Sequence, residues 1–310
     1  MVPSLKQDLN SIWYNYYIDG NYSTVINQQN PTISNINQNL FLYQCTFNNL
    51  HDTCIKITSD QAKGLHSDCV FMNISSVTEG SIVYIEYSNI VQRRFIAQNC
   101  YSNIRAGASY INMNDQSTSE SFTEESSIVQ CGTIKVDNVL YNNNGKTRFS
   151  YINFSKNWYY EDGFYLSTHN FENISFSTIE ENNVAQYSTF EVSYCNECSM
   201  IYCNVLRNHQ NGVFGTISDS GTALNIYNTN FIGNYYGVLF YASSNATIKI
   251  YNSYIDTITT IGTVIVINPA YSMLNNSQLI SINQPQNSNK TIYRTHSIHI
   301  YRHFMRMHRL

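Results

Sequence analysis

Apolar residues recur along this chain at intervals near 25 residues. Ile226-Tyr227-Asn228 stands 24 residues before Ile250-Tyr251-Asn252, and Ile201-Tyr202 stands 25 residues before the first of these. Five positions after each start, another apolar residue follows, at Leu206, Phe231 and Ile255 respectively. This period is too short for helical repeats and is typical of one turn, or coil, of a β-solenoid.

The same pair of positions extends through most of the sequence and predicts about ten coils. The further pairs are Leu42/Phe47, His66/Phe71, Ile96/Tyr101, Ile128/Thr133, Phe149/Phe154, Ile174/Ile179 and Leu274/Leu279. Residues five apart on one straight strand would face opposite sides of a sheet. Because both members are apolar in nearly every pair, with His66 and Thr133 as the exceptions, we expect a bend between them.

Polar and small side chains occupy the positions between the two apolar anchors. Asn228, Asn252 and Asn276 fall two positions after the start, where asparagine tolerates a left-handed backbone and its amides can bond from coil to coil. The next position is small, as at Cys45 and Cys69. The predicted stacked columns therefore comprise amide, thiol and inward aromatic residues, namely Asn228, Asn252, Asn276, Cys45, Cys69, Phe47, Phe71 and Phe231.

A glycine repeatedly precedes a further apolar run, and we expect another strand to begin there in each coil. These glycines are Gly80, Gly107, Gly163, Gly212, Gly237 and Gly262. Two or three short strands per coil, separated by bends, indicate an all-β protein with the fold of a parallel β-helix.

The pattern predicts three regions. Residues 1–38 are expected to be an N-terminal cap or incomplete first coils, with Trp13, Tyr14, Tyr16 and Tyr17 as capping side chains. Residues 39–289 form the β-helix. Residues 290–310, rich in Arg and His, are expected to be a disordered or truncated basic tail. Between Ile96 and Phe149 the register is left open, with residues 112–127 expected to be a protruding polar loop.

Charge and hydropathy exclude several classes of protein. The formal net charge is −4 and only 12% of residues are charged, so the chain lacks the basic excess that drives nucleic-acid binding. We find no apolar run long enough for a transmembrane helix, and no signal-peptide pattern at the start of the chain.

The segment Ile226 to Asn234, followed by Gly237 to Tyr241, resembles the coils of right-handed parallel β-helix proteins of the pectin-lyase-like superfamily. It is particularly similar to the Asn-, Ile-, Tyr- and Cys-rich β-helix proteins of some protists. The resemblance implies a surface or extracellular location. Many members of that superfamily bind or cleave polysaccharide, and many have no known activity. The resemblance therefore allows both a binding protein and an enzyme, and the fold alone does not decide between them.

Catalysis on such a scaffold would use acidic residues grouped on neighbouring coils. The acids instead occur as sequence neighbours, at Glu124-Glu125, Glu161-Asp162 and Glu180-Glu181. Neighbours on a strand point to opposite faces, so we interpret these pairs as solvated residues and expect no catalytic site. A polysaccharide lyase or glycoside hydrolase is the alternative.

The cysteines predict buried thiols. Cys45, Cys69 and Cys131 share one predicted column, where small buried side chains are favoured. Cys195 and Cys198 have the spacing of a zinc-binding pair, but a matching second pair is missing, so we expect no metal and no cofactor. If the protein is secreted, disulfide bonds between some of these cysteines are an alternative.

The best functional candidates are Tyr202, Tyr227 and Tyr251, which follow three successive anchors and should form an exposed aromatic stripe. Such rings either shield the sheet or hold a ligand. We therefore expect a non-catalytic recognition protein that binds carbohydrate, or a host or cell-surface protein, along an outer strand face. The sequence predicts no oligomeric state.

Overall fold

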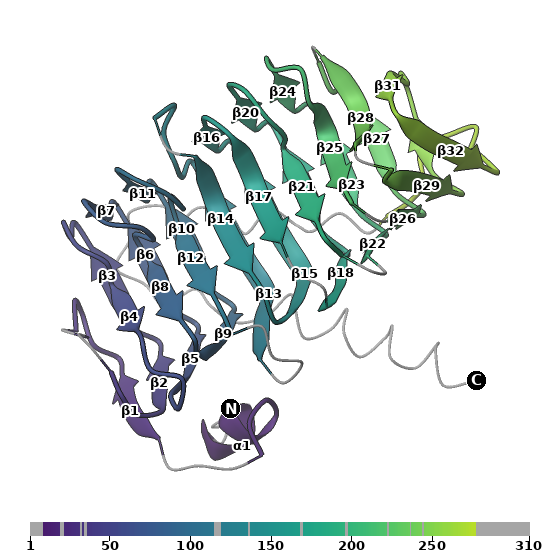
Figure 1. The fold of residues 1–310 in the computed structure, drawn as a ribbon. Coiled ribbons are helices and arrows are strands. Elements are labelled where there is room, and N and C mark those ends of the chain that lie inside the picture. Colours follow the sequence, from purple (N-terminus) through teal and green to yellow (C-terminus); the bar gives the residue numbers. More distant parts are fainter. Residues whose placement is uncertain are drawn as a thin grey trace, which may run out of the picture. The chain divides into compact units, whose positions relative to one another are not determined.

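The protein is a parallel β-solenoid of about eight turns, against the ten predicted, and it contains almost no helix. The computed structural model describes residues 9–276 apart from 19–21, 32, 34–35, 115–118, 136, 168–169, 196–197, 222, 236 and 244. Figure 1 shows the strands of successive coils lying side by side in sequence order. The predicted tail at 290–310 lies outside the described residues.

Most coils contribute a strand to a first ladder and then bend into a second ladder. The first ladder comprises β1 (Ser23–Ile26), β2 (Leu40–Tyr43), β5 (Lys63–Ser67), β9 (Asn89–Arg93), the first halves of β13 (Glu120–Val129) and β15 (Lys146–Ser155), β18 (Asn170–Ser175), β22 (Cys198–Ile201), β26 (Ala223–Tyr227), β29 (Thr247–Tyr251) and β32 (Thr263–Ile267). The second comprises β3 (Thr46–Asn48), β6 (Val70–Met72), β10 (Ile96–Gln98), the second halves of β13 and β15, β19 (Thr178–Glu180), β23 (Asn204–Leu206), β27 (Asn230–Ile232) and β30 (Tyr254–Ile255).

The opposite wall of the solenoid is a nine-stranded sheet, reached through short connecting strands. The short strands are β7 (Ser75–Ser76), β11 (Tyr101–Ser102), β16 (Trp158–Tyr159), β20 (Asn183–Val184) and β24 (His209–Gln210). The wall comprises β4 (Ile55–Ile57), β8 (Val83–Glu86), β12 (Ser109–Asn112), β14 (Asn138–Asn143), β17 (Asp162–Ser167), β21 (Phe190–Ser193), β25 (Gly215–Ser220), β28 (Val238–Ser243) and β31 (Thr260–Ile261).

A left-handed residue makes the first corner of every coil, between the two ladders. Its members have φ between 45° and 57° and are Asn27, Gln44, Asp68, Arg94, Glu125, Tyr151, Phe176, Tyr202, Asn228, Asn252 and Asn268. The predicted bend is therefore confirmed. Asn228 and Asn252 lie in this column as expected. Asn276 does not, because Asn268 takes the place after Asn252.

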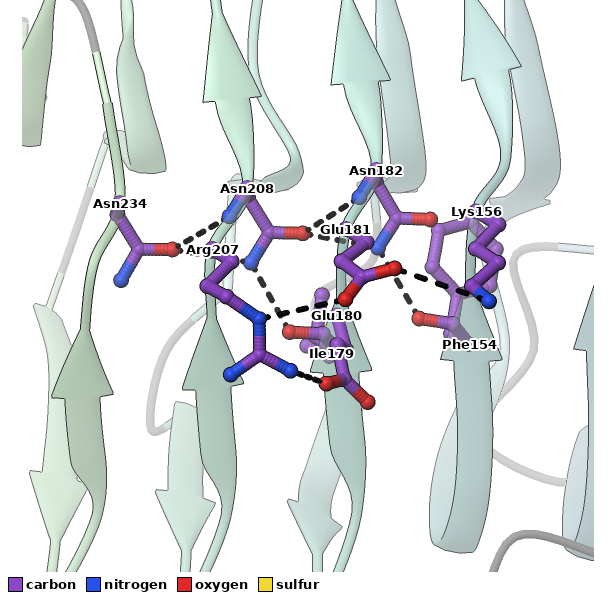
Figure 2. A network of polar contacts seen from close by, with 9 residues as sticks. All are labelled: Phe154, Lys156, Ile179, Glu180, Glu181, Asn182, Arg207, Asn208 and Asn234. Carbon is purple, nitrogen blue, oxygen red and sulfur yellow. Dashed lines mark hydrogen bonds and ion pairs between the residues drawn. The ribbon is translucent and has the colours of Figure 1, made fainter.

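A second left-handed corner follows the second ladder, and the position after it holds a buried asparagine ladder that we did not predict. Asn182 Nδ2 donates to Asn208 Oδ1 (2.9 Å) and to Phe154 O (3.0 Å), and Asn208 Nδ2 donates to Asn234 Oδ1 (3.0 Å). The main-chain N–H of Asn182 also donates to Asn208 Oδ1 (3.1 Å). Figure 2 shows these amides repeating from coil to coil. They satisfy main-chain groups that the bend removes from the sheet.

Apolar side chains from all walls meet in one core. Phe47, Phe71 and Phe231 are fully buried, as predicted, and the rings of Phe47 and Phe71 stack with centroids 4.9 Å apart. Cys45 and Cys69 are buried thiols immediately after the first corner. Cys131 lies in the asparagine column instead, where its main-chain N–H donates to Asn157 Oδ1 (2.8 Å).

The register differs from the prediction in the middle of the chain and at its end. Ile96 pairs with Val70 and Ser127 in the second ladder, so it is not a first-ladder anchor. Residues 120–127 belong to β13, so only part of the predicted 112–127 loop connects strands. Gly262 precedes β32, which continues the first ladder beside β29 rather than the opposite wall.

The N-terminal segment packs on the flank of the first coils. Helix α1 (Leu9–Tyr14) and the residues after it bury Trp13 and Tyr17 against Phe41, Leu65, Val91 and Phe122 on the outer side of the first ladder. The Tyr17 hydroxyl donates to Gly64 O (2.7 Å). None of the helices in the described part of the chain has the length and apolar character needed to cross a membrane.

Candidate binding face

The three predicted tyrosines all lie on the outside of the solenoid, but they occupy two neighbouring columns. Tyr227 and Tyr251 pair on β26 and β29, and their rings stack with centroids 4.9 Å apart. Ile201, not Tyr202, pairs with Tyr227. Tyr202 therefore lies one residue further along, at the first corner, with φ 54°. The prediction of a single column was wrong by one residue at this tyrosine.

Tyr202 ends a stack of rings that follows the first corner. Tyr151 and Phe176 have centroids 5.1 Å apart, and Phe176 and Tyr202 have centroids 5.3 Å apart. Left-handed backbone is costly for bulky residues, and parallel stacking of rings one coil apart offsets part of that cost. With Tyr227 and Tyr251, these residues form an aromatic ribbon of five rings on five successive coils.

The ribbon changes column between Tyr202 and Tyr227. The residue after Tyr202 in the corner column is Asn228, so an amide takes the place of the next ring. Tyr202 is 42% exposed, while Tyr227, Tyr251 and Asn228 are half-buried. The ribbon thus presents an exposed ring beside an amide, which together offer flat apolar area and hydrogen-bonding groups to a ligand.

A second tyrosine ladder on the opposite wall was missed by the sequence analysis. Tyr84, Tyr110, Tyr141 and Tyr165 stack with successive centroids 5.1, 5.0 and 5.2 Å apart. Part of the signal was present in the sequence, since Tyr84, Tyr110 and Tyr165 each follow an apolar or small residue in a predicted strand.

The geometry of this second ladder favours a structural role. Tyr110 is 7% exposed, and burial, reinforced by Glu79, raises the pKa of its hydroxyl to about 12. Its ring lies between two other rings, and Arg105 lies over Tyr141 at 5.2 Å from the centroid. The aromatic ribbon is the better candidate because its corner stack ends in Tyr202, which is 42% exposed.

Glu180 and Glu181 take part in an ion cluster on the outer surface near the second corner (Figure 2). Arg207 contacts both carboxylates, with its Nε 3.3 Å from Glu181 Oε1, and Lys156 Nζ is 3.8 Å from Glu181 Oε2. The four side chains are between 27% and 58% exposed. Exposed ion pairs of this kind contribute little stability, and these carboxylates already face cations of the chain itself.

Asp162 differs from the prediction of a solvated acid because it is only 3% exposed. Burial and the nearby Glu191 of the neighbouring coil raise the pKa of the Asp162 carboxyl well above its ordinary value. Asp162 Oδ1 accepts the main-chain N–H of Ser188 (2.9 Å), and Glu191 Oε1 accepts the Ser193 hydroxyl (3.1 Å). This carboxyl pair was not predicted. The burial of Asp162 leaves it poorly placed to reach a substrate.

The cysteines divide into one disulfide and six buried thiols. Cys195 and Cys198 are joined to each other, so the spacing that suggested a zinc pair belongs to a disulfide. Burial raises the pKa of the Cys100 and Cys203 thiols, which keeps them protonated and unreactive. The candidate metal ligands in the described part of the chain form no group of three or more.

Comparison with protein-family models, with curated proteins and with solved structures found no match to this chain. The parallel β-solenoid rests on the structure itself. Right-handed winding and membership of the pectin-lyase-like superfamily stay predictions.

Proposed function

We propose that this protein is a non-catalytic recognition protein that binds an extended carbohydrate along the aromatic ribbon. The observation that carries the proposal is the exposed Tyr202 ring at the end of a ring stack, beside the Asn228 amide. Sugars bind to proteins through flat apolar contact combined with hydrogen bonds to their hydroxyl groups.

The regular repeat supports an extended ligand rather than a small one. Coils of a parallel solenoid repeat about every 4.8 Å, so equivalent side chains recur at a fixed spacing along the axis. A linear polysaccharide also presents the same groups at a fixed spacing. Several weak contacts, each to one sugar unit, can then add up along one chain.

An extracellular or cell-surface location is part of the proposal. The Cys195–Cys198 disulfide supports it, because disulfides persist in oxidising compartments.

The test is a glycan array, followed by titration calorimetry with the best binder, using Tyr202→Asn. Asparagine occupies the next two corners of the same column, so this change keeps a backbone that the fold accepts. We expect affinity to fall about tenfold, since a stacking ring contributes up to about 1.5 kcal/mol beyond the apolar area that it buries.

Tyr87→Asn is the matched control. Tyr87 is also a left-handed tyrosine, with φ 68° and 47% exposure, but it follows β8 on the opposite wall. Affinity should be unchanged in this variant. Equal losses in the two variants, or binding of the wild type to a surface protein and to no glycan, would overturn the carbohydrate proposal.

A further inference from the structure

The last coil of the solenoid is shorter than the others. Asn252 and Asn268 occupy successive first corners only 16 residues apart, whereas Asn228 and Asn252 are 24 apart. The chain passes from β31 to β32 through Gly262 alone, which has φ +80°. A Cβ atom at Gly262 would lie 1.8 Å from Ala242 O, so this tight return requires glycine.

This short return leaves an apolar strand at the end of the solenoid. Val264 and Val266 continue the columns of Ile248 and Ile250, which are fully buried, but are themselves only half-buried. Ile265 on the same strand is 42% exposed, and nearby Ile258 and Ile261 are 51% and 47% exposed.

One edge of β32 pairs with β29, and no strand of the described residues pairs with its other edge. An open, apolar strand edge is a template for pairing with another chain. The opposite end of the solenoid is more polar, because β1 begins with Ser23 and Thr24 before it continues with Val25 and Ile26.

The chain that follows β32 runs away from this end. The Ala270 N–H donates to Ser253 O (3.0 Å), and the Leu274 N–H donates to Asn230 Oδ1 (2.8 Å). Asn276 Nδ2 then donates to Asn228 O (2.8 Å) and Cys203 O (2.9 Å). These partners lie on successively earlier coils. Residues 270–276 therefore follow the flank of the solenoid and leave β32 uncovered.

We propose that two copies of this chain associate end to end by antiparallel pairing of β32 with β32 across a two-fold axis. Ile265 is the central residue of the five-residue strand, so the two-fold axis passes beside it. Val264 and Val266 of each copy then lie against the apolar end of the other copy. A two-fold arrangement matches the apolar edge with itself. Head-to-tail stacking would instead match it with the more polar edge of β1.

The test measures the mass of the full-length protein by light scattering and sedimentation over a range of concentrations, with Ile265→Lys as the variant. Lys249 stands at the equivalent position of β29, so this column accepts lysine without loss of the fold. In the dimer two such lysines would face each other at the axis. We expect a wild-type dimer and a dissociation constant at least about 100-fold higher in the variant.

Tyr271→Lys is the control, since Tyr271 is 99% exposed and lies outside the strand; its dimer should be unchanged. Hydrogen exchange of the wild type gives an independent readout, and the β32 amides should gain protection as concentration rises. A monomer at every concentration, a filament, or a dimer that persists in Ile265→Lys would overturn the proposal. A dimer that appears only on truncation after Asn276 would show that residues 277–310 cover the edge, and would overturn it for the full chain.

Discussion

Replacing Asn182 with alanine is expected to destabilise the protein by about 4 kcal/mol. Asn182 Oδ1 accepts the main-chain N–H of Asn157 (3.0 Å), and its Nδ2 donates to Phe154 O (3.0 Å). The side chain is fully buried, so water does not replace it in the folded state. Each stranded main-chain group costs roughly 1–3 kcal/mol, and the cavity adds to this.

The measurement is urea unfolding followed by far-ultraviolet circular dichroism, with hydrogen exchange to locate the change. Exchange should accelerate first at the Asn157 amide, because solenoids can open locally between neighbouring coils. Asn103→Ala is the control, since Asn103 is an exposed asparagine of the same solenoid and should lose about 0.5 kcal/mol or less. A loss at Asn182 no larger than at Asn103 would show that the buried ladder does not stabilise the coils.

The first corner and its flanking anchors could be predicted from the sequence because the signals are local. Leu42 and Phe47 are apolar, five residues apart and separated by a polar residue, and this combination requires a bend wherever both face inward. Asparagine at Asn228 and Asn252 indicates the left-handed backbone directly. No knowledge of distant contacts is needed for either inference.

The prediction that Tyr202 shares a column with Tyr227 and Tyr251 was wrong. Coils differ in length, so a repeated dipeptide does not by itself fix which residues of neighbouring strands pair. Ile201-Tyr202 matches Ile226-Tyr227 in letters, but Met200 is the fully buried residue that pairs with Ile226. Burial of the anchor decides the register, and a one-residue slip reverses every side chain on the strand. Met200 and Ile201 are both hydrophobic, so hydrophobicity alone does not show which of them faces inward. The match between the two Ile-Tyr dipeptides therefore favoured Ile201, although Met200 is the inward residue.

The buried asparagine ladder and the Asp162–Glu191 pair required contacts that the sequence does not display. Asn182, Asn208 and Asn234 recur 26 residues apart, but the chain contains many other asparagines at similar spacings. Which column faces inward depends on the second corner, and that corner is formed by residues as different as Lys156 and Gly233. Asp162 and Glu191 meet only after the lengths of two successive coils are known.

Asp219 is a buried carboxyl that should make stability depend on pH. It lies on β25 between Val192 and Ala242 in a column that faces the core, and its side chain is fully buried. Neither carboxylate oxygen forms a well-aligned hydrogen bond within the described residues. Burial raises the pKa of this carboxyl from 3.8 to about 7, although the nearby main-chain N–H of Leu224 acts to lower it, and Glu191 adds a small further rise. Folding therefore favours the protonated form.

A carboxyl with a raised folded pKa destabilises the protein most above that pKa, and not at all below the unfolded value. Asp219→Asn should therefore stabilise the protein at pH 8 by about 4 kcal/mol, which is the free energy of a shift of roughly three pKa units. The gain should shrink as the pH falls from 7 and vanish near pH 4, because protonated Asp219 and asparagine are both neutral. Urea unfolding at several pH values measures it, with the exposed Asp60→Asn as the control. A gain in stability that is absent at pH 8, or is the same at pH 4 and pH 8, would mean that burial of the ionised Asp219 carboxylate does not destabilise the protein.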